Sequence, residues 1–133
     1  MRRLLSGLLL AMGALIALGA FGHSFMGRLE VDQELGKFPI AFDVDSMLYV
    51  TWYFVGGCMA LFGLTIVWAW WRLRRGETTL LGVTGLIGAL YVATGLGGFL
   101  YRHRDPFMLM FLLEGALLLL CSTVLHKRTP LHV

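Results

Sequence analysis

Residues 80–100 read LLGVTGLIGALYVATGLGGFL, a run without a single charged side chain. Three further apolar runs of similar length lie at about residues 4–22, 47–71 and 107–125. Each is close to the roughly 20 residues with which a helix crosses the hydrocarbon core of a bilayer. A spanning segment is either a helix or part of a closed barrel, because hydrocarbon offers the backbone no hydrogen-bond partner. The runs lack the polar and apolar alternation of barrel strands, so the sequence predicts an all-α polytopic membrane protein, a four-transmembrane-helix bundle in one domain over residues 1–133.

The composition of the whole chain agrees with this prediction. The 133 residues are 58% hydrophobic and 14% charged, with a mean hydropathy of +0.77. An ordinary soluble domain is roughly 45–50% apolar and about 25% charged. These values disfavour a soluble enzyme and a disordered tail. The net charge of +3 is spread between the apolar runs instead of forming one basic stripe, so we expect the lipid bilayer, and no nucleic acid, as a partner.

The polar connections between the runs predict the orientation. Residues 72–79 (RLRRGETT) form a basic turn, residues 101–106 (YRHRDP) a second turn, and residues 23–46 a long polar loop. Asp105 and Pro106 are typical of the start of a helix. A cytoplasmic N-terminus places seven Lys and Arg residues inside and four outside. Because cytoplasmic loops are enriched in these residues, the sequence predicts an inner-membrane protein with both termini in the cytoplasm and 23–46 as an outer loop.

Two further features bear on the spans themselves. The run after Met1-Arg2-Arg3 resembles a signal peptide, but it is long enough to cross the membrane, so we expect a retained helix. Cys58 and Cys121 both fall inside predicted helices and are expected to be packing residues, not a disulfide.

Small residues predict how the helices pack, because transmembrane helices associate by close approach of their backbones. The third span has glycines every three residues at Gly82, Gly85 and Gly88, and more at its outer end. The other small residues expected to form packing grooves are Gly13, Ala17 and Gly19 in the first span, and Gly56, Gly57, Ala60 and Gly63 in the second.

Glu114 is the one Asp, Glu, Lys, Arg or His deep within a predicted span. It lies eight residues after Pro106, which places it about 12 Å along the last helix. A charge at that depth costs free energy, so we expect the carboxyl group to face the interior and to be protonated or paired. Three roles are open at this point: a structural hydrogen bond to a neighbouring helix, a ligand, ion or proton site, and a contact with a partner subunit.

Further polar residues are expected near Glu114, at the outer end of the bundle. Histidine, arginine and aromatic side chains at one end of a bundle suit an anionic head group, a quinone-like carbonyl or a metal, and single residues of these kinds are also common at membrane interfaces. The predicted ligand site therefore consists of Glu114, His23, Arg102, His103, Tyr53 and Trp52. The chain lacks the Cys and His spacings of structural zinc sites and the Glu-x-x-His pairs of di-iron bundles. We predict no metal ligands and no catalytic residues, and the sequence identifies no particular cofactor.

The chain resembles the small DoxX-like bacterial inner-membrane proteins of four helices. The resemblance rests on the order of the spans, on Tyr53-Phe54-Val55-Gly56-Gly57, on Gly97-Gly98 followed by Arg102, and on a turn at Pro106 that leads to Glu114. Some members of that family look like accessory subunits of quinone-linked oxidoreductases, so the resemblance implies a redox partner. The long connection that begins at His23 and Ser24 departs from the family pattern, and the resemblance implies no role for it.

These observations favour a non-enzymatic integral membrane protein. It would act as an accessory subunit beside a membrane-protein partner, or as a self-associating structural bundle. The alternative is a small-ligand site around Glu114 in the outer half of the bundle, for a quinone, a lipid or a proton. An enzyme activity of its own has the least support.

Overall fold

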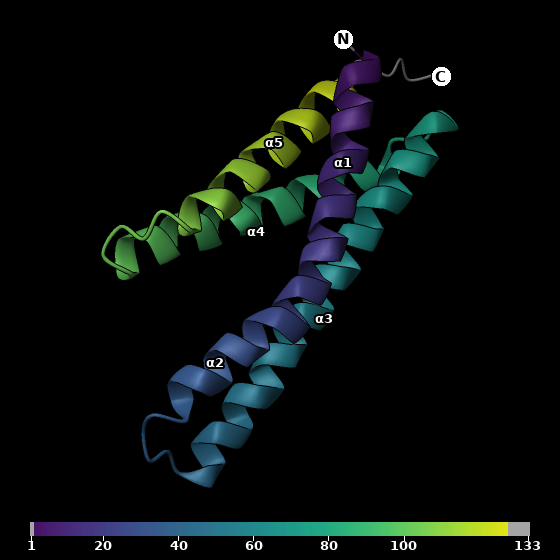
Figure 1. Cartoon of the computed structure of the whole chain (residues 1–133). Coiled ribbons are helices and arrows are strands. Elements are labelled where there is room, and N and C mark those ends of the chain that lie inside the picture. Colours follow the sequence, from purple (N-terminus) through teal and green to yellow (C-terminus); the bar gives the residue numbers. More distant parts are fainter. Residues whose placement is uncertain (1, 128–133) are drawn as a thin grey trace. The chain divides into compact units, whose positions relative to one another are not determined.

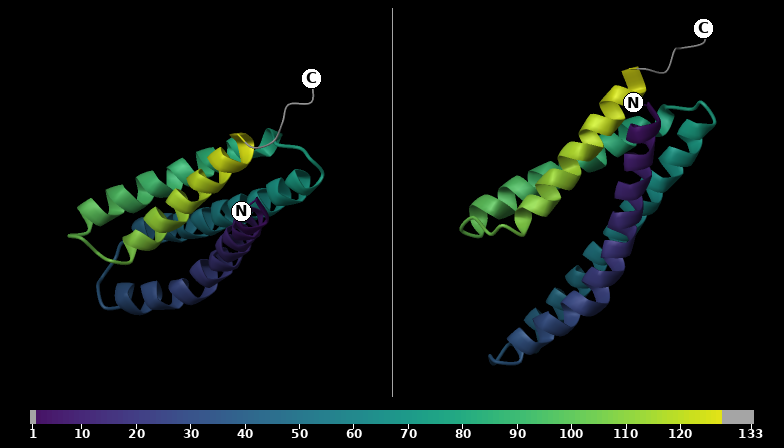
Figure 2. Two further views of the ribbon diagram at one scale, coloured as in Figure 1. Left: turned by 90° about the horizontal axis from the view of Figure 1, so that it is seen from above. Right: turned by 45° about the horizontal axis from the view of Figure 1, so that its top comes forward.

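The structure is a computed structural model that describes residues 2–127, and among these it contains helices and no strand (Figure 1). The helices are α1 (Arg2–Phe21), η1 (Gly22–Gly27), α2 (Arg28–Leu35), α3 (Phe42–Arg74), α4 (Thr79–Tyr101) and α5 (Met108–Lys127). Four helical segments within residues 2–127 are long and apolar enough to cross a membrane. Two further views show the same helices from other sides (Figure 2). The prediction of an all-α chain with four transmembrane helices is confirmed.

The first helix extends well beyond the predicted span. The segments α1, η1 and α2 form one continuous helix over Arg2–Leu35. The prediction of a loop over residues 23–46 is therefore wrong, since the non-helical connection covers only residues 36–41. The charged residues of this stretch end the apolar run, but they do not end the helix. Arg28 forms an ion pair with Asp32, four residues later, and pairs at this spacing stabilise a helix. No proline interrupts the chain before Pro39.

Contacts between residues divide the chain into two compact units. One unit contains the start of α1 up to Met12, the end of α3 from Thr65, and the whole of α4 and α5. The other unit contains residues 13–64, which include the end of α1, η1, α2 and most of α3. Each unit has its own close helix contacts.

Glycines bring α4 and α5 together in the first unit. A side-chain carbon on Gly115 would lie 2.5 Å from the carbonyl oxygen of Gly88, and one on Gly95 would lie 2.5 Å from the backbone nitrogen of Leu112. The two backbones therefore touch, as the small residues predict. Gly82 and Gly97 are different, because a side chain at either position would meet nothing within 4 Å.

Short turns join the helices of this unit. After α3, Gly76 has a φ of +88°, and the Glu77 amide donates to the Arg72 carbonyl at 3.1 Å, which is the glycine-ended helix cap of the Schellman type. Before α5, the Asp105 carboxylate accepts a hydrogen bond from the Phe107 amide at 2.9 Å. Asp105 thus stabilises the turn that precedes α5, which begins at Met108.

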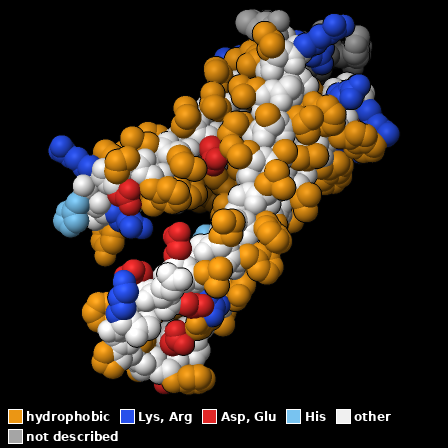
Figure 3. Space-filling model, viewed as in Figure 1, with side chains coloured by type: hydrophobic (Ala, Val, Ile, Leu, Met, Phe, Trp, Pro, Cys, Tyr) orange, Lys and Arg blue, Asp and Glu red, His pale blue; other side chains and the backbone are white. Residues whose placement is uncertain are grey.

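Many large hydrophobic side chains lie exposed on the outer faces of the helices. Leu4, Leu18 and Leu86 are each more than 70% exposed, and hydrophobic side chains run along α1, α4 and α5 in the space-filling view (Figure 3). Soluble monomers rarely expose contiguous apolar surface on this scale. Such a surface fits helices that face lipid, so the chain has the features of a multi-pass membrane protein.

Candidate functional site

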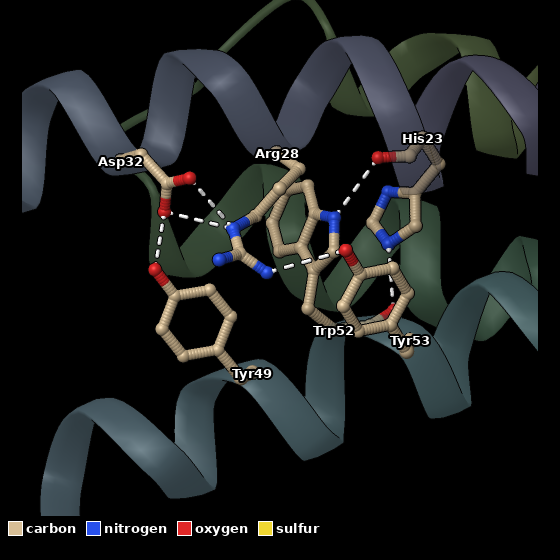
Figure 4. A network of polar contacts seen from close by, with 6 residues as sticks. All are labelled: His23, Arg28, Asp32, Tyr49, Trp52 and Tyr53. Carbon is tan, nitrogen blue, oxygen red and sulfur yellow. Dashed lines mark hydrogen bonds and ion pairs between the residues drawn. The ribbon is translucent and has the colours of Figure 1, made fainter.

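A network of polar side chains joins η1 and α2 to α3 within residues 13–64 (Figure 4). Arg28 lies at its centre. The Arg28 Nε donates to both carboxylate oxygens of Asp32, at 2.7 and 2.9 Å. Its Nη1 donates to the Tyr53 hydroxyl at 3.3 Å, and its guanidinium carbon lies 3.2 Å from the centre of the Tyr49 ring. The Tyr49 hydroxyl closes the network by donating to Asp32 at 2.7 Å.

The network provides partners for the charge of a largely buried arginine. The Arg28 side chain is 19% exposed, and a buried charge needs a partner and hydrogen bonds. Asp32 supplies the opposite charge, and the Tyr49 ring supplies a cation–π contact. A guanidinium group carries five N–H donors, and within residues 2–127 the Arg28 Nη2 has no hydrogen-bond partner. Arg28 therefore keeps donors for a further acceptor.

His23 and Trp52 form the second part of the network. Their rings stack with centres 4.1 Å apart. The Trp52 indole N–H donates to the His23 carbonyl at 2.9 Å. The His23 Nε2 lies 3.3 Å from the Trp52 carbonyl oxygen, which accepts a hydrogen bond when Nε2 carries the proton. The side chain of each residue thus contacts the backbone carbonyl of the other, which fixes η1 against α3.

Local sequence explains this close contact. The segment η1 is a π-helix (GHSFMG), a wider turn that often occurs at functional sites. It begins and ends with glycine, and a side-chain carbon on Gly27 would lie 3.0 Å from the Trp52 ring. On α3, a side-chain carbon on Gly56 would collide with the Ser24 hydroxyl. Glycine at these two positions therefore allows the helices to approach.

A partly open hollow of about 250 Å³ lies beside the network, between α2 and α3. Aliphatic side chains form one part of its wall and aromatic rings another, and the arginine of the network borders it. The lining residues are Arg28, Val31, Leu35, Leu48, Tyr49 and Trp52. The wall of the hollow is thus almost wholly apolar, and the Arg28 side chain lies at its border.

The structure brings three of the predicted site residues together: His23, Trp52 and Tyr53. The other three belong to the unit that contains α4 and α5. Arg102 forms an ion pair with Asp105 at 3.2 Å, and His103 is exposed in the turn with a φ of 53°. Glu114 is half-buried on α5.

Sequence reasoning missed Arg28 and Asp32, the centre of the network. The reason is that residues 23–46 were expected to be a loop, in which neighbours four apart have no fixed relation. On a helix the same spacing places them on one face. The sequence does contain an indication of this pair, because Arg28 and Asp32 lie four residues apart shortly after an apolar helix.

Two chemical possibilities receive no support within residues 2–127. No group of three or more His, Cys, Asp and Glu residues is placed to hold a metal ion. Ser24 and His23, neighbours in sequence, make no side-chain hydrogen bond to one another in the described part of the chain, so they do not form a nucleophile and base pair.

Comparisons with protein-family models, with curated proteins and with solved structures found no match for this chain. The resemblance to DoxX-like proteins therefore rests on its short sequence motifs alone.

Proposed function

We propose that this chain is a non-enzymatic, multi-pass protein of a bacterial inner membrane that binds a membrane lipid in the hollow between α2 and α3. The hollow is the observation that carries the proposal. Its walls are aliphatic and aromatic, and an arginine with unused donors borders it. This combination suits an amphipathic molecule whose chain lies against Val31 and Leu48 while an oxygen atom accepts from Arg28.

The depth of the hollow along α3 supports a lipid. At 1.5 Å per residue, the helix from Leu48 to Arg74 rises about 39 Å, whereas the hydrocarbon core is about 30 Å thick. With Arg72 and Arg74 at the cytoplasmic head groups, as the basic turn predicts, Leu48 lies near the opposite head groups. Tyr49 and Trp52 are residue types that are enriched at that level. Lipids present phosphate, carbonyl oxygen and the start of the acyl chain there.

The size and charge of the site narrow the class of ligand further. A volume of about 250 Å³ is below the roughly 300–1,000 Å³ that encloses a drug-sized molecule. The hollow therefore takes one segment of a larger molecule, such as part of an acyl chain. Because Asp32 neutralises Arg28, the site carries no net charge. This favours a zwitterionic or neutral lipid over an anionic lipid.

Filling the hollow tests this function. Leu48 lines it, whereas Val50, two residues away on α3, does not and is 72% exposed. The Leu48→Trp variant and the Val50→Trp control would be purified in a mild detergent, and lipids that stay bound would be identified by mass spectrometry. We expect wild type and Val50→Trp to retain lipid and Leu48→Trp to lose most of it. Equal retention in all three proteins would contradict the proposal.

We further propose that the chain works with a membrane-protein partner, or with a second copy of itself, as an accessory component. The composition and the DoxX-like motifs favour such a role, since they offer no catalytic group. Co-purification of the full chain from its native membrane would identify the partner.

A further inference from the structure

The end of α3 and the turn that follows it bring two arginines against tryptophan rings. The Arg75 guanidinium carbon lies 3.6 Å from the centre of the Trp71 ring, and that of Arg74 lies 5.2 Å from the centre of the Trp70 ring. In both pairs the ring precedes the arginine by four residues, which is about one helical turn. Each guanidinium group therefore lies over an aromatic face, where a cation–π contact holds it.

Only one of the three arginines in this turn has an acidic partner. Arg72 forms an ion pair with Glu77. Arg74 and Arg75 are exposed, and within residues 2–127 neither makes an ion pair or a side-chain hydrogen bond. The turn thus presents two positive charges that no carboxylate neutralises.

An arginine that lies over an aromatic ring keeps its hydrogen-bond donors. The five N–H groups of a guanidinium lie in its own plane, so a ring against one face blocks none of them. The contact with Trp71 also limits the motion of the Arg75 side chain. A planar fork that is already oriented binds a phosphate group through two parallel hydrogen bonds with little further loss of entropy.

The tryptophans indicate the depth of this turn in the membrane. Trp side chains are enriched at the membrane–water interface, and Trp71 is 42% exposed at the end of a helix that is long and apolar enough to span the bilayer. Arg75 follows Trp71 by four residues, so it lies about 6 Å further from the hydrocarbon. Lipid phosphate groups lie at that level.

We propose that Arg75, held over Trp71, and Arg74 form a site for the phosphate of an anionic phospholipid, such as phosphatidylglycerol. Their charges have no acidic partner in the described part of the chain, whereas Arg28 at the hollow is neutralised by Asp32. The turn therefore selects a lipid with net negative charge. This site does not depend on lipid binding in the hollow, or on which side of the membrane the turn faces.

Lipid titration followed by native mass spectrometry tests this site. The full chain in mild detergent would be titrated with dioleoyl phosphatidylglycerol. Arg75→Lys keeps the charge but removes the planar fork and its stacking, and we expect it to weaken binding about threefold or more. Arg3→Lys is the matched control, because Arg3 is exposed and contacts no ring within residues 2–127. Equal affinities of wild type and Arg75→Lys would refute the site.

Two tryptophan variants separate an arginine held by a ring from general attraction to positive charge. Trp71→Leu leaves every charge in place and removes the ring under Arg75, and it is expected to weaken binding about threefold. Trp68→Leu is the control, because Trp68 is also exposed on α3 and has no arginine over its ring within the described chain. If Trp71→Leu binds as tightly as Trp68→Leu, binding follows charge alone and the assignment of Trp71 is wrong.

Two further ligands identify the source of the phosphate. Dioleoyl phosphatidylcholine has the same acyl chains and a phosphate but no net charge, and its binding is expected to be equal in wild type and Arg75→Lys. Glycerol phosphate is soluble, and we expect millimolar concentrations to leave phosphatidylglycerol bound. Displacement by glycerol phosphate, or an equal loss of both lipids in Arg75→Lys, would contradict a site for an anionic lipid.

Discussion

At the scale of single residues, glycines of α4 and α5 that look alike in the sequence have different surroundings. Gly115 and Gly88 touch across the two helices, and the carbonyl of Gly88 leaves no room for a side chain on Gly115. Gly82 stands two turns from Gly88 and faces open space. Spacing alone predicted that α4 contains packing glycines, but it could not say which ones touch, because that depends on the rotation of each helix about its axis.

Gly115→Ala is therefore expected to destabilise the α4–α5 pair, whereas Gly82→Ala is not. The new methyl group at Gly115 would press on backbone atoms of Gly88 and Val92, which cannot move aside like a flexible side chain. Overpacking of this kind costs about 1–3 kcal/mol, and a change in open space stays within about 0.5 kcal/mol. Chemical unfolding in detergent, followed by circular dichroism, measures both. Equal stability of the two variants would show that the contact does not hold the helices together.

At the scale of helices, the apolar runs were predictable and their extension was not. All four spans could be located because each run must be long enough to cross hydrocarbon. Helix α2 was missed because the apolar run that identifies a span ends before it, and short-range pairs such as Arg28 with Asp32 stabilise this part of the helix instead. The polar network depends on that extension. The sequence could therefore indicate His23, Trp52 and Tyr53 as polar residues near a membrane surface, but not the arginine that connects them.

At the scale of the whole molecule, the distribution of basic residues predicts the topology. The turn at Arg72, Arg74 and Arg75 is expected in the cytoplasm, and the helix end near Gln33 on the other side, because positive loops are retained inside.

Cysteine labelling of intact cells measures this arrangement. In a background without Cys58 and Cys121, a membrane-impermeant thiol reagent is expected to label Gln33→Cys in intact cells, and Arg75→Cys only after the membrane is opened. Both positions are exposed in the structure, so access depends on the side of the membrane. The reverse pattern would invert the topology and place the lipid site in the cytoplasmic leaflet.

The central claim is that the hollow between α2 and α3 binds a lipid. Its most direct test is crosslinking of the wild-type protein in liposomes that contain a phosphatidylcholine with a photoactivatable group in its acyl chain. Peptide mass spectrometry then locates the crosslinked residues. We predict that crosslinks concentrate at Val31, Leu35 and Leu48, which line the hollow. Crosslinks spread evenly over exposed positions such as Leu64 and Leu86, with no excess at the hollow, would contradict the claim.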